Sequence, residues 1–322
     1  MIGSRCPASL GQNTPKRDSN RKSDSCMSNV FRSAATVFVG LWLSASAATL
    51  PVSAAETPLV LGQIGVSFYA VTGAVVQEVL ERLGHPVTVR EGAHKEIFPL
   101  LAAGKVDLLV AVWLPHAHNH LWEEYGGDAF VLAPMYHGAR IFWAVPDYVP
   151  EADVASIADL AKPDVAARMI RTLQGIGPKA GTSVRSLKAI AAYGLDKAGY
   201  EYRFGTWQDR HRALESAVRD RRWTVVSMAA PMFLNRAYAL RPLDDPLGIF
   251  GQANEGMLVG HKSLPDKVPQ RTLDTLRRIR LGLEAVNELD YLVVLENRTL
   301  REAARLWMAQ NADTVEKWFT ED

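Results

Sequence analysis

The sequence predicts an α/β protein of two lobes, and three features favour this fold class. At 322 residues the chain exceeds what one hydrophobic core usually holds. Short apolar runs alternate with amphipathic helical stretches from residue 59 onward, and the alternation starts again after residue 146. No repeat or low-complexity linker separates the two runs. We therefore expect lobe 1 to comprise residues 56–145 and 247–322, and lobe 2 to comprise residues 146–246.

The first run predicts strand, helix, strand, helix, strand. Its elements are expected at Leu59–Ile64, Tyr69–Leu83, Val87–Val89, Lys95–Ala103 and Leu108–Val112. Gly84 and Gly104 end the two helices. The last strand is apolar throughout, which is typical of parallel strands covered on both faces. This order of elements predicts a parallel sheet with right-handed connections.

The second run repeats the pattern after a strand at Arg140–Val145. Its expected elements are Ser156–Leu160, Thr172–Ile176, Ser183–Tyr193, Tyr202–Phe204, Asp209–Arg221 and Thr224–Met228. An extended segment, Ile249–His261, leads to helices expected at Leu273–Leu289, Asp290–Glu296 and Leu300–Phe319. Because ligands of open parallel sheets bind beyond the carboxyl ends of the strands, we expect a cleft between the lobes there.

The N-terminus predicts export. Arg32 precedes an apolar run, Ala34–Ala48, which is shorter than the roughly 20 residues that span a bilayer. Small residues follow, so we expect cleavage after Ala54 or Ala55. Residues 1–26 are polar, and Met27 is the expected true start. Residues 1–55 are therefore interpreted as an extension plus a cleaved signal peptide, and the mature protein as periplasmic.

Composition excludes several classes of function. A formal charge of +1 gives no field that would hold nucleic acid or an anionic membrane. Both cysteines, Cys6 and Cys26, precede the cleavage site, and no apolar run precedes Cys26, so we expect neither a disulfide nor a lipoprotein. No nucleophile elbow or P-loop occurs, which disfavours an enzyme. Three histidines in His116–His120 lack tetrahedral spacing, so neither a metal nor another cofactor is expected.

Five segments, in order, resemble one known family. They are Val106–Tyr125 (VDLLVAVWLPHAHNHLWEEY), Gly138–Val149, Ser156–Leu160, Gly175–Gly181 and Arg241–Pro246. Together they are similar to the substrate-binding proteins of ABC importers of the glycine betaine/proline betaine type. The resemblance covers nearly all of the mature chain. It implies a type II-like periplasmic binding protein with two crossovers acting as a hinge.

The resemblance also implies a site. Members hold a quaternary ammonium group in a cage of aromatic faces, at about 0.5–2 kcal/mol per contact. Trp113 matches a cage tryptophan, and His118 matches the histidine that follows it. Phe68 stands near a position where the family often has tryptophan, so Phe68 and Tyr69 are expected to supply a wall of the site. Backbone amides near Ala70 and Val71 are expected to receive a ligand carboxylate.

The match departs from the family at Ala229–Phe233 (AAPMF), where a Trp-x-Pro-His-Trp pattern is usual. Met232 replaces the histidine and Phe233 the second tryptophan. Trp207 is expected to compensate from lobe 2, and Lys179 to offer a cation to a ligand carboxylate. For Phe68 and Phe233, packing in the core is an equally open interpretation.

The expected function is capture of a betaine-like compound (glycine betaine, choline or carnitine) and delivery to an ABC permease driven by its ATPase. The alternatives are an amino acid or small amine as ligand, a sensor in place of a transporter, and an exported hydrolase. The binding protein is expected to act as a monomer.

Overall fold

The structure is a computed structural model and describes residues 58–320. The predictions of Met27 as the start, of the signal peptide and of its cleavage site concern residues outside that range. Within residues 58–320, no helix is both long and apolar enough to cross a membrane.

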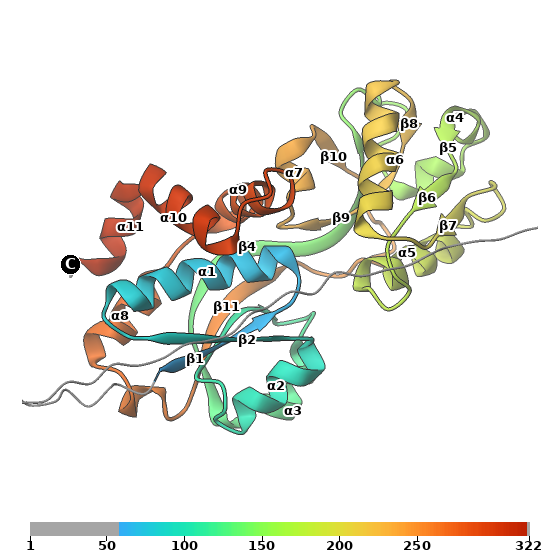
Figure 1. Ribbon diagram of the computed structural model, residues 1–322. Coiled ribbons are helices and arrows are strands. Elements are labelled where there is room, and N and C mark those ends of the chain that lie inside the picture. The colour runs from blue at the N-terminus through green and yellow to red at the C-terminus, as the bar shows by residue number, and fades with distance from the viewer. Residues whose placement is uncertain (1–57, 321–322) are drawn as a thin grey trace, which may run out of the picture. The chain divides into compact units, whose positions relative to one another are not determined.

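The first α/β run forms as predicted, with element ends that differ by a few residues. Its elements are β1 (Leu59–Ile64), α1 (Ser67–Arg82), β2 (Val87–Gly92), α2 (His94–Ala102) and β3 (Leu108–Leu114). β1 pairs in parallel with β2 on one side and with β3 on the other. Figure 1 shows α1 on one face of these strands and α2 on the other, followed by α3 (Asn119–Tyr125).

The sheet is mixed, so the prediction of a parallel sheet holds only for β2-β1-β3. β11 (Asn254–His261) lies between β3 and β4 (Ala129–Pro146) and is antiparallel to both. The chain reaches β11 only after completing lobe 2, and it re-enters the first sheet in the opposite direction. The resulting strand order is β10-β4-β11-β3-β1-β2.

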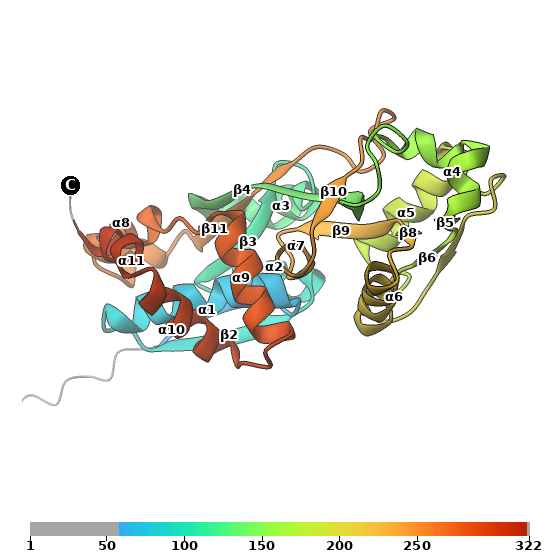
Figure 2. The same ribbon diagram turned by 90° about the horizontal axis from the view of Figure 1, so that it is seen from above.

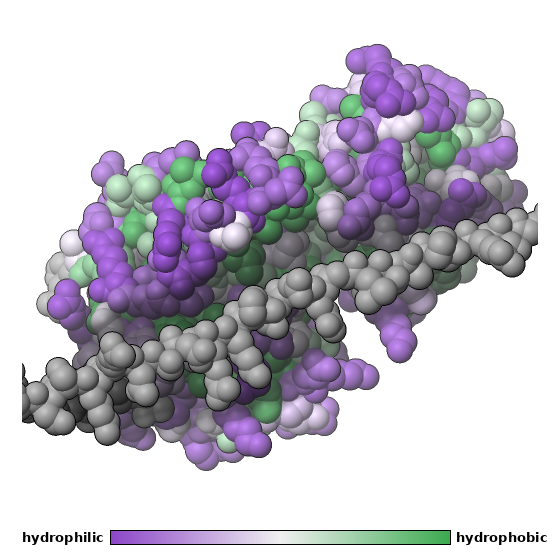
Figure 3. Space-filling view, in the orientation of Figure 1, coloured by the Kyte–Doolittle hydropathy of each residue, from purple (hydrophilic) through white to green (hydrophobic). Residues whose placement is uncertain are grey.

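The second run forms with its two main helices near their predicted positions, and the strand predicted at Thr172–Ile176 is shorter than expected. Its elements are α4 (Pro163–Arg168), β5 (Met169–Ile170), β6 (Thr172–Gln174), α5 (Gly181–Ala192), β7 (Glu201–Arg203), α6 (Trp207–Arg219), β8 (Trp223–Thr224), β9 (Val226–Ala230), α7 (Leu234–Ala237) and β10 (Leu240–Pro242). Three-residue to five-residue 3₁₀ turns occur at Gly126–Asp128, Ile157–Ala161 and Leu264–Asp266. β5 pairs in parallel with β8, and β6 pairs in parallel with β7. In the view of Figure 3, hydrophilic residues predominate over α6.

β4 runs for 18 residues and contributes to both lobes. Its first part pairs with β11, and its last residues pair with β9 on one side and β10 on the other. Figures 1 and 2 show it as one continuous ribbon between the two groups of helices. Trp143 and Val145 of β4 belong to the hydrophobic cluster of lobe 2, whereas Val226 and Phe233 belong to that of lobe 1. The exact boundary between the lobes remains a prediction.

The C-terminal helices differ from their predicted ranges. They are α8 (Gln270–Arg278), α9 (Gly282–Val294), α10 (Leu300–Gln310) and α11 (Ala312–Phe319). The helix predicted at Leu273–Leu289 is interrupted before Gly282, which has a φ of +75°. Asp290–Glu296 is no separate helix, because its first residues continue α9. The helix predicted at Leu300–Phe319 is divided at Asn311.

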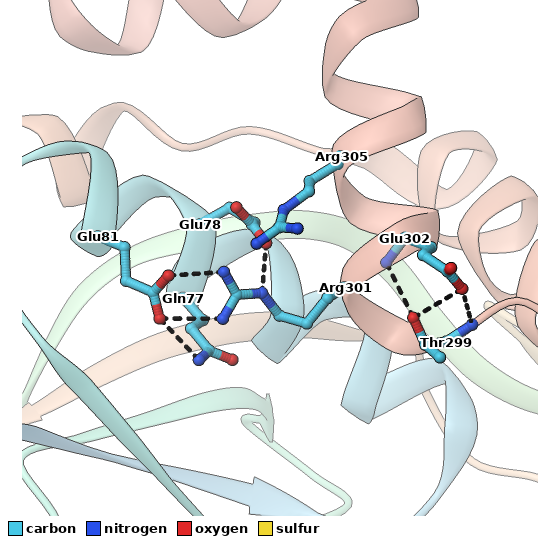
Figure 4. A network of polar contacts seen from close by, with 7 residues as sticks. All are labelled: Gln77, Glu78, Glu81, Thr299, Arg301, Glu302 and Arg305. Atoms are coloured by element: carbon cyan, nitrogen blue, oxygen red, sulfur yellow. Dashed lines mark hydrogen bonds and ion pairs between the residues drawn. The ribbon is translucent and has the colours of Figure 1, made fainter.

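A network of polar side chains ties α10 to α1 (Figure 4). Arg301 donates to both carboxylate oxygens of Glu81, at 3.0 and 2.6 Å, and also to Glu78. Arg305 donates to Glu78 at 2.9 Å. Such bidentate, charge-assisted bonds fix geometry better than single ones. α1, whose first turns carry predicted site residues, is thereby held from its outer side.

Candidate ligand-binding site

Trp113 lies near the end of β3 and is held from β4. Every residue of β3 is buried, and Trp113 is only 3% exposed. Its indole Nε1 donates a hydrogen bond to the hydroxyl of Tyr136, at 2.9 Å. Burial raises the pKa of Tyr136, so its hydroxyl remains neutral. The orientation of the Trp113 ring is therefore fixed before any ligand arrives.

His118 closes the loop that follows β3. The Trp113 amide donates to His118 Nδ1, and the His118 amide donates to the Trp113 carbonyl, both at 2.9 Å. Because Nδ1 accepts a bond, the neutral imidazole carries its proton on Nε2. Burial, followed by the neighbouring His94 and His120, lowers the pKa of His118 to about 3. At neutral pH this ring is an uncharged donor.

Phe68 and Tyr69, in the first turn of α1, complete a contiguous set of rings. The Phe68 ring lies 4.5 Å from that of Tyr69 and 5.8 Å from that of Trp113, in the second case stacked. Tyr69 lies 5.5 Å from Trp113 and 6.0 Å from His118. These four residues are called the lobe 1 aromatic cluster. They meet because β1 and β3 are parallel neighbours whose carboxyl ends share one edge.

The start of α1 was predicted to offer the amides near Ala70 and Val71 to a ligand carboxylate. The Ala70 amide is already used, since it donates to the Val66 carbonyl at 3.0 Å. The amides of Ser67 and Phe68 begin α1 and find no backbone acceptor among the described residues. First-turn amides of this kind are the ones that a helix leaves unpaired.

A second aromatic group comes from α6 and the segment after β9. Trp207 begins α6, where the Thr206 side chain caps the helix by accepting from Asp209. The Trp207 ring meets the Phe233 ring edge-on at 5.9 Å, and His211 meets Phe233 in the same way at 5.6 Å. Trp207 is 41% exposed, so one of its faces is open. Among the described residues no ring contact joins this group to the lobe 1 aromatic cluster.

Helix α9 holds Met232 and Phe233 through two consecutive amides. The Met232 amide donates to Asn287 Oδ1 at 2.8 Å, and the Phe233 amide donates to Asp290 Oδ2 at 2.6 Å. Asp290 is fully buried, and this burial raises its pKa to about 6, against the opposing effects of Ser67, Phe233 and Arg210. Above that pH the carboxylate places a negative charge next to the Phe233 amide.

Arg210 is a residue that sequence reasoning missed. It lies on the buried face of α6 together with Leu214 and Ala217, and it is 3% exposed. Its Nη2 lies 3.5 Å from the Met232 sulfur. The signal that could have found it is its helical spacing: a cation at i with apolar residues at i+4 and i+7.

The eight predicted residues thus divide into three sets. The lobe 1 aromatic cluster contains four, and Trp207, Met232 and Phe233 form a second wall. Lys179 stands apart: it is exposed in the turn before α5. A cavity of about 210 Å³ in lobe 2 is lined by none of the eight. Within residues 58–320, no three side chains of metal-binding type come together.

Comparisons with known proteins identify the family of the chain. A family profile described as the substrate-binding domain of the ABC-type glycine betaine transport system matches residues 57–310. A curated relative, the glycine betaine/carnitine transport binding protein GbuC of Listeria monocytogenes serotype 1/2a (strain 10403S), is 28% identical over 158 residues. That match covers 49% of this chain and 52% of GbuC, so the chain spans about half the length of this relative.

Solved structures share the fold. Lactococcal OpuAC, in a closed form complexed with glycine betaine, gives a TM-score of 0.67 at 24% identity, covering 82% of this chain and 100% of OpuAC. The glycine betaine/L-proline-binding protein ProX of Borrelia burgdorferi gives 0.66 at 22%, covering 82% and 97%. A choline-binding protein in complex with choline gives 0.63 at 18%, covering 81% and 91%. The predicted two-lobed α/β fold is confirmed by these similarities.

Proposed function

Because the chain belongs to the family of substrate-binding domains of ABC-type glycine betaine transport systems, we propose that it captures a betaine-like quaternary ammonium compound and delivers it to a permease. The ligand class comprises glycine betaine, choline, carnitine and their relatives. Members of this family bind solutes and do not catalyse, so the exported hydrolase is set aside. The energy for import comes from the ATPase that drives the permease.

The lobe 1 aromatic cluster is the observation that supports this proposal. A methylated ammonium has no hydrogen to donate, so it is held by ring faces at about 0.5–2 kcal/mol each. Phe68, Tyr69 and Trp113 supply rings within 6 Å of one another, and none carries a charge. His118 is neutral as well, because its pKa is about 3. No cation in this cluster would repel an onium ligand.

The second wall differs from the usual pattern of the family but keeps aromatic rings. Phe233 retains an aromatic ring at the end of the segment where the family usually has tryptophan, and Trp207 meets it edge-on. Above pH 6 Asp290, which accepts a hydrogen bond from the Phe233 amide, carries a negative charge, and a nearby negative charge favours a cationic ligand. We assign the carboxylate of a zwitterionic ligand to the free amides of Ser67 and Phe68.

Capture proceeds by closure of the lobes in this proposal. The ligand docks on the lobe 1 aromatic cluster, and lobe 2 then brings Trp207 and Lys179 over it, whereas Met232 stays attached to α9. The hinge lies in the strands near Arg140–Val145 and Leu240–Pro246. Capture by a monomer outside the inner membrane, after export by the N-terminal signal, completes the proposal.

Calorimetric titration tests the ligand class. The purified protein is titrated with glycine betaine, choline, carnitine and a panel of amino acids. Saturable micromolar binding of at least one onium compound is the expected result. Binding of an amino acid, with no heat from any onium compound, would retain the family and the fold but overturn the betaine-like ligand.

Trp207→Ala tests the second wall, with Phe204→Ala as its control. Both residues are exposed aromatics of lobe 2, at 41% and 47%, but Phe204 contacts Tyr202 rather than any predicted site residue. Loss of one cation–π contact corresponds to a 2- to 30-fold weakening, from about 0.5–2 kcal/mol. We expect that weakening for Trp207→Ala alone. Equal affinities of the two variants would remove Trp207 from the site.

A further inference from the structure

The Arg210 guanidinium is buried without an anionic partner. Nη1 donates to the Ser227 carbonyl at 3.1 Å, and Nη2 lies 3.5 Å from the Met232 sulfur, a weak acceptor. Nε is buried and makes no hydrogen bond. No ion pair joins Arg210 to a carboxylate in the part of the chain that the structure describes, and Asp290 acts on it only at longer range. Burial lowers the pKa of Arg210 to about 10, yet it remains a cation at neutral pH.

An uncompensated buried charge is costly to a folded protein. Removing a guanidinium from water is offset only when carboxylates or other acceptors satisfy it. One carbonyl and one thioether leave most of its five N–H donors unsatisfied. The local structure therefore favours any anion that reaches Arg210.

A cavity gives an anion that access. It has a volume of about 210 Å³ and lies between α6 and the short strands β6 and β8. Since a water occupies about 30 Å³, it has room for a small ion with waters. Arg203, Arg210 and Arg222 all line it, together with the hydroxyl-bearing Thr224. None of its lining residues is acidic.

The nearby acidic side chains do not line the cavity, and they form ion pairs with its two exposed arginines. Arg203 pairs with Glu201 at 3.2 Å, and Arg222 lies 3.7 Å from Asp220. Both pairs are solvent-exposed. Their carboxylates reduce the charge at the mouth of the cavity, but neither pairs with Arg210. The unbalanced positive charge is at the buried end.

We propose that this lobe 2 cavity binds a small oxyanion, which pairs with Arg210 at its buried end and with Arg203 and Arg222 at its mouth. Oxyanions suit the site because the planar guanidinium donates two parallel N–H bonds to two oxygens. The site is separate from the onium site, but Arg210 also contacts Met232 of the second wall. The bound anion holds Arg210 in place behind that wall.

This proposal is tested by titrating the purified protein with inorganic phosphate, sulfate and acetate. The titrations are done without an onium ligand and at constant ionic strength. We expect saturable binding of one equivalent. Stronger binding of phosphate or sulfate would show that the cavity prefers an inorganic oxyanion. Stronger binding of acetate would show that it prefers a carboxylate. The proposal would be overturned if none of the three anions showed saturable binding up to 10 mM. That concentration is on the order of a hundredfold above the dissociation constant of a specific site.

Variants locate the binding. Arg203→Gln and Arg222→Gln change exposed residues and should each weaken binding at least tenfold, whereas Arg210→Gln should abolish it. Arg212→Gln is the matched control, since Arg212 is an exposed arginine of α6 that does not line the cavity. Should Arg210→Gln fail to fold, the two exposed variants still decide. The assignment would be contradicted if the variants at Arg203, Arg210 and Arg222 all retained anion binding. It would also be contradicted if Arg212→Gln weakened binding as much as they do. Because no onium compound is present, the outcome is independent of the proposed transport function.

Discussion

Asp290→Asn tests whether the buried charge of Asp290, next to Phe233 of the second wall, destabilises the folded protein. Asp290 is fully buried on α9 and accepts a hydrogen bond from the Phe233 amide at 2.6 Å. An asparagine has nearly the same shape, and its side-chain oxygen can accept the same bond. The substitution therefore removes the ionisation of the side chain with little change in packing.

The magnitude follows from the pKa. Burial raises the pKa of Asp290 from 3.8 to about 6, so the folded protein holds this proton at pH values where the unfolded chain has lost it. Stability is therefore lost as the pH rises from 3.8 to 6. At 1.36 kcal/mol per pH unit, the loss amounts to about 3 kcal/mol at neutral pH. Asp290→Asn escapes this loss and should be the more stable protein at pH 7.5.

Urea denaturation at pH 4 and pH 7.5 measures the effect. The stability of Asp290→Asn relative to the native protein should increase by about 2 kcal/mol between the two pH values. Glu288→Gln is the control, because Glu288 lies on the same helix in a surface pair with Arg236 and should shift by less than about 1 kcal/mol. The reasoning would be refuted if the difference in the free energy of unfolding between Asp290→Asn and the native protein were the same at both pH values.

Three further predictions concern His118, Lys179 and Arg301. Because burial lowers the pKa of His118 to about 3, the native protein should lose about 2 kcal/mol more stability than His118→Gln when the pH falls from 7 to 5, as measured by urea denaturation. Lys179→Ala should weaken binding of glycine betaine by about two- to fivefold but leave choline, which has no carboxylate, unchanged in calorimetry; equal effects on both ligands would exclude a carboxylate contact. Arg301→Ala removes the Arg301 bonds to Glu78 and Glu81 and should lower the stability by about 1–3 kcal/mol, whereas an unchanged Tm would mean that these bonds add no net stability.

The sequence predicted best what depends on local patterns. The strand Leu59–Ile64 was placed correctly because it is a short, mostly apolar run followed by Gly65 and an amphipathic helical stretch. The direction of β11 could not be predicted, because it depends on how the chain returns after lobe 2 rather than on any property of Asn254–His261. The end of the helix at Ile279 was missed since the apolar spacing continues through the break before Gly282.

The site was predictable in part for the same reason. Trp113 and Phe68 could be brought together from sequence because both follow strands of the first run, and the carboxyl ends of neighbouring strands coincide. Arg210 gave only its helical spacing from Leu214 and Ala217 as a signal, and Asp290 gave none, so neither could be assigned to the site from the sequence. A buried charge is recognised only when its neighbours in space are known.

The 18-residue strand β4 limits how such proteins can exchange parts during evolution. Recombination that swapped residues 146–246 between relatives would separate β9 and β10 from the strand that both of them flank. The imported β9 and β10 would then pair with the recipient's β4, and the core of the imported lobe would receive the recipient's residue 143 in place of its own. A viable exchange must instead begin before Arg140, so that each new lobe brings its own half of β4. Ligand specificity and lobe architecture should therefore be inherited together, with the shared strand.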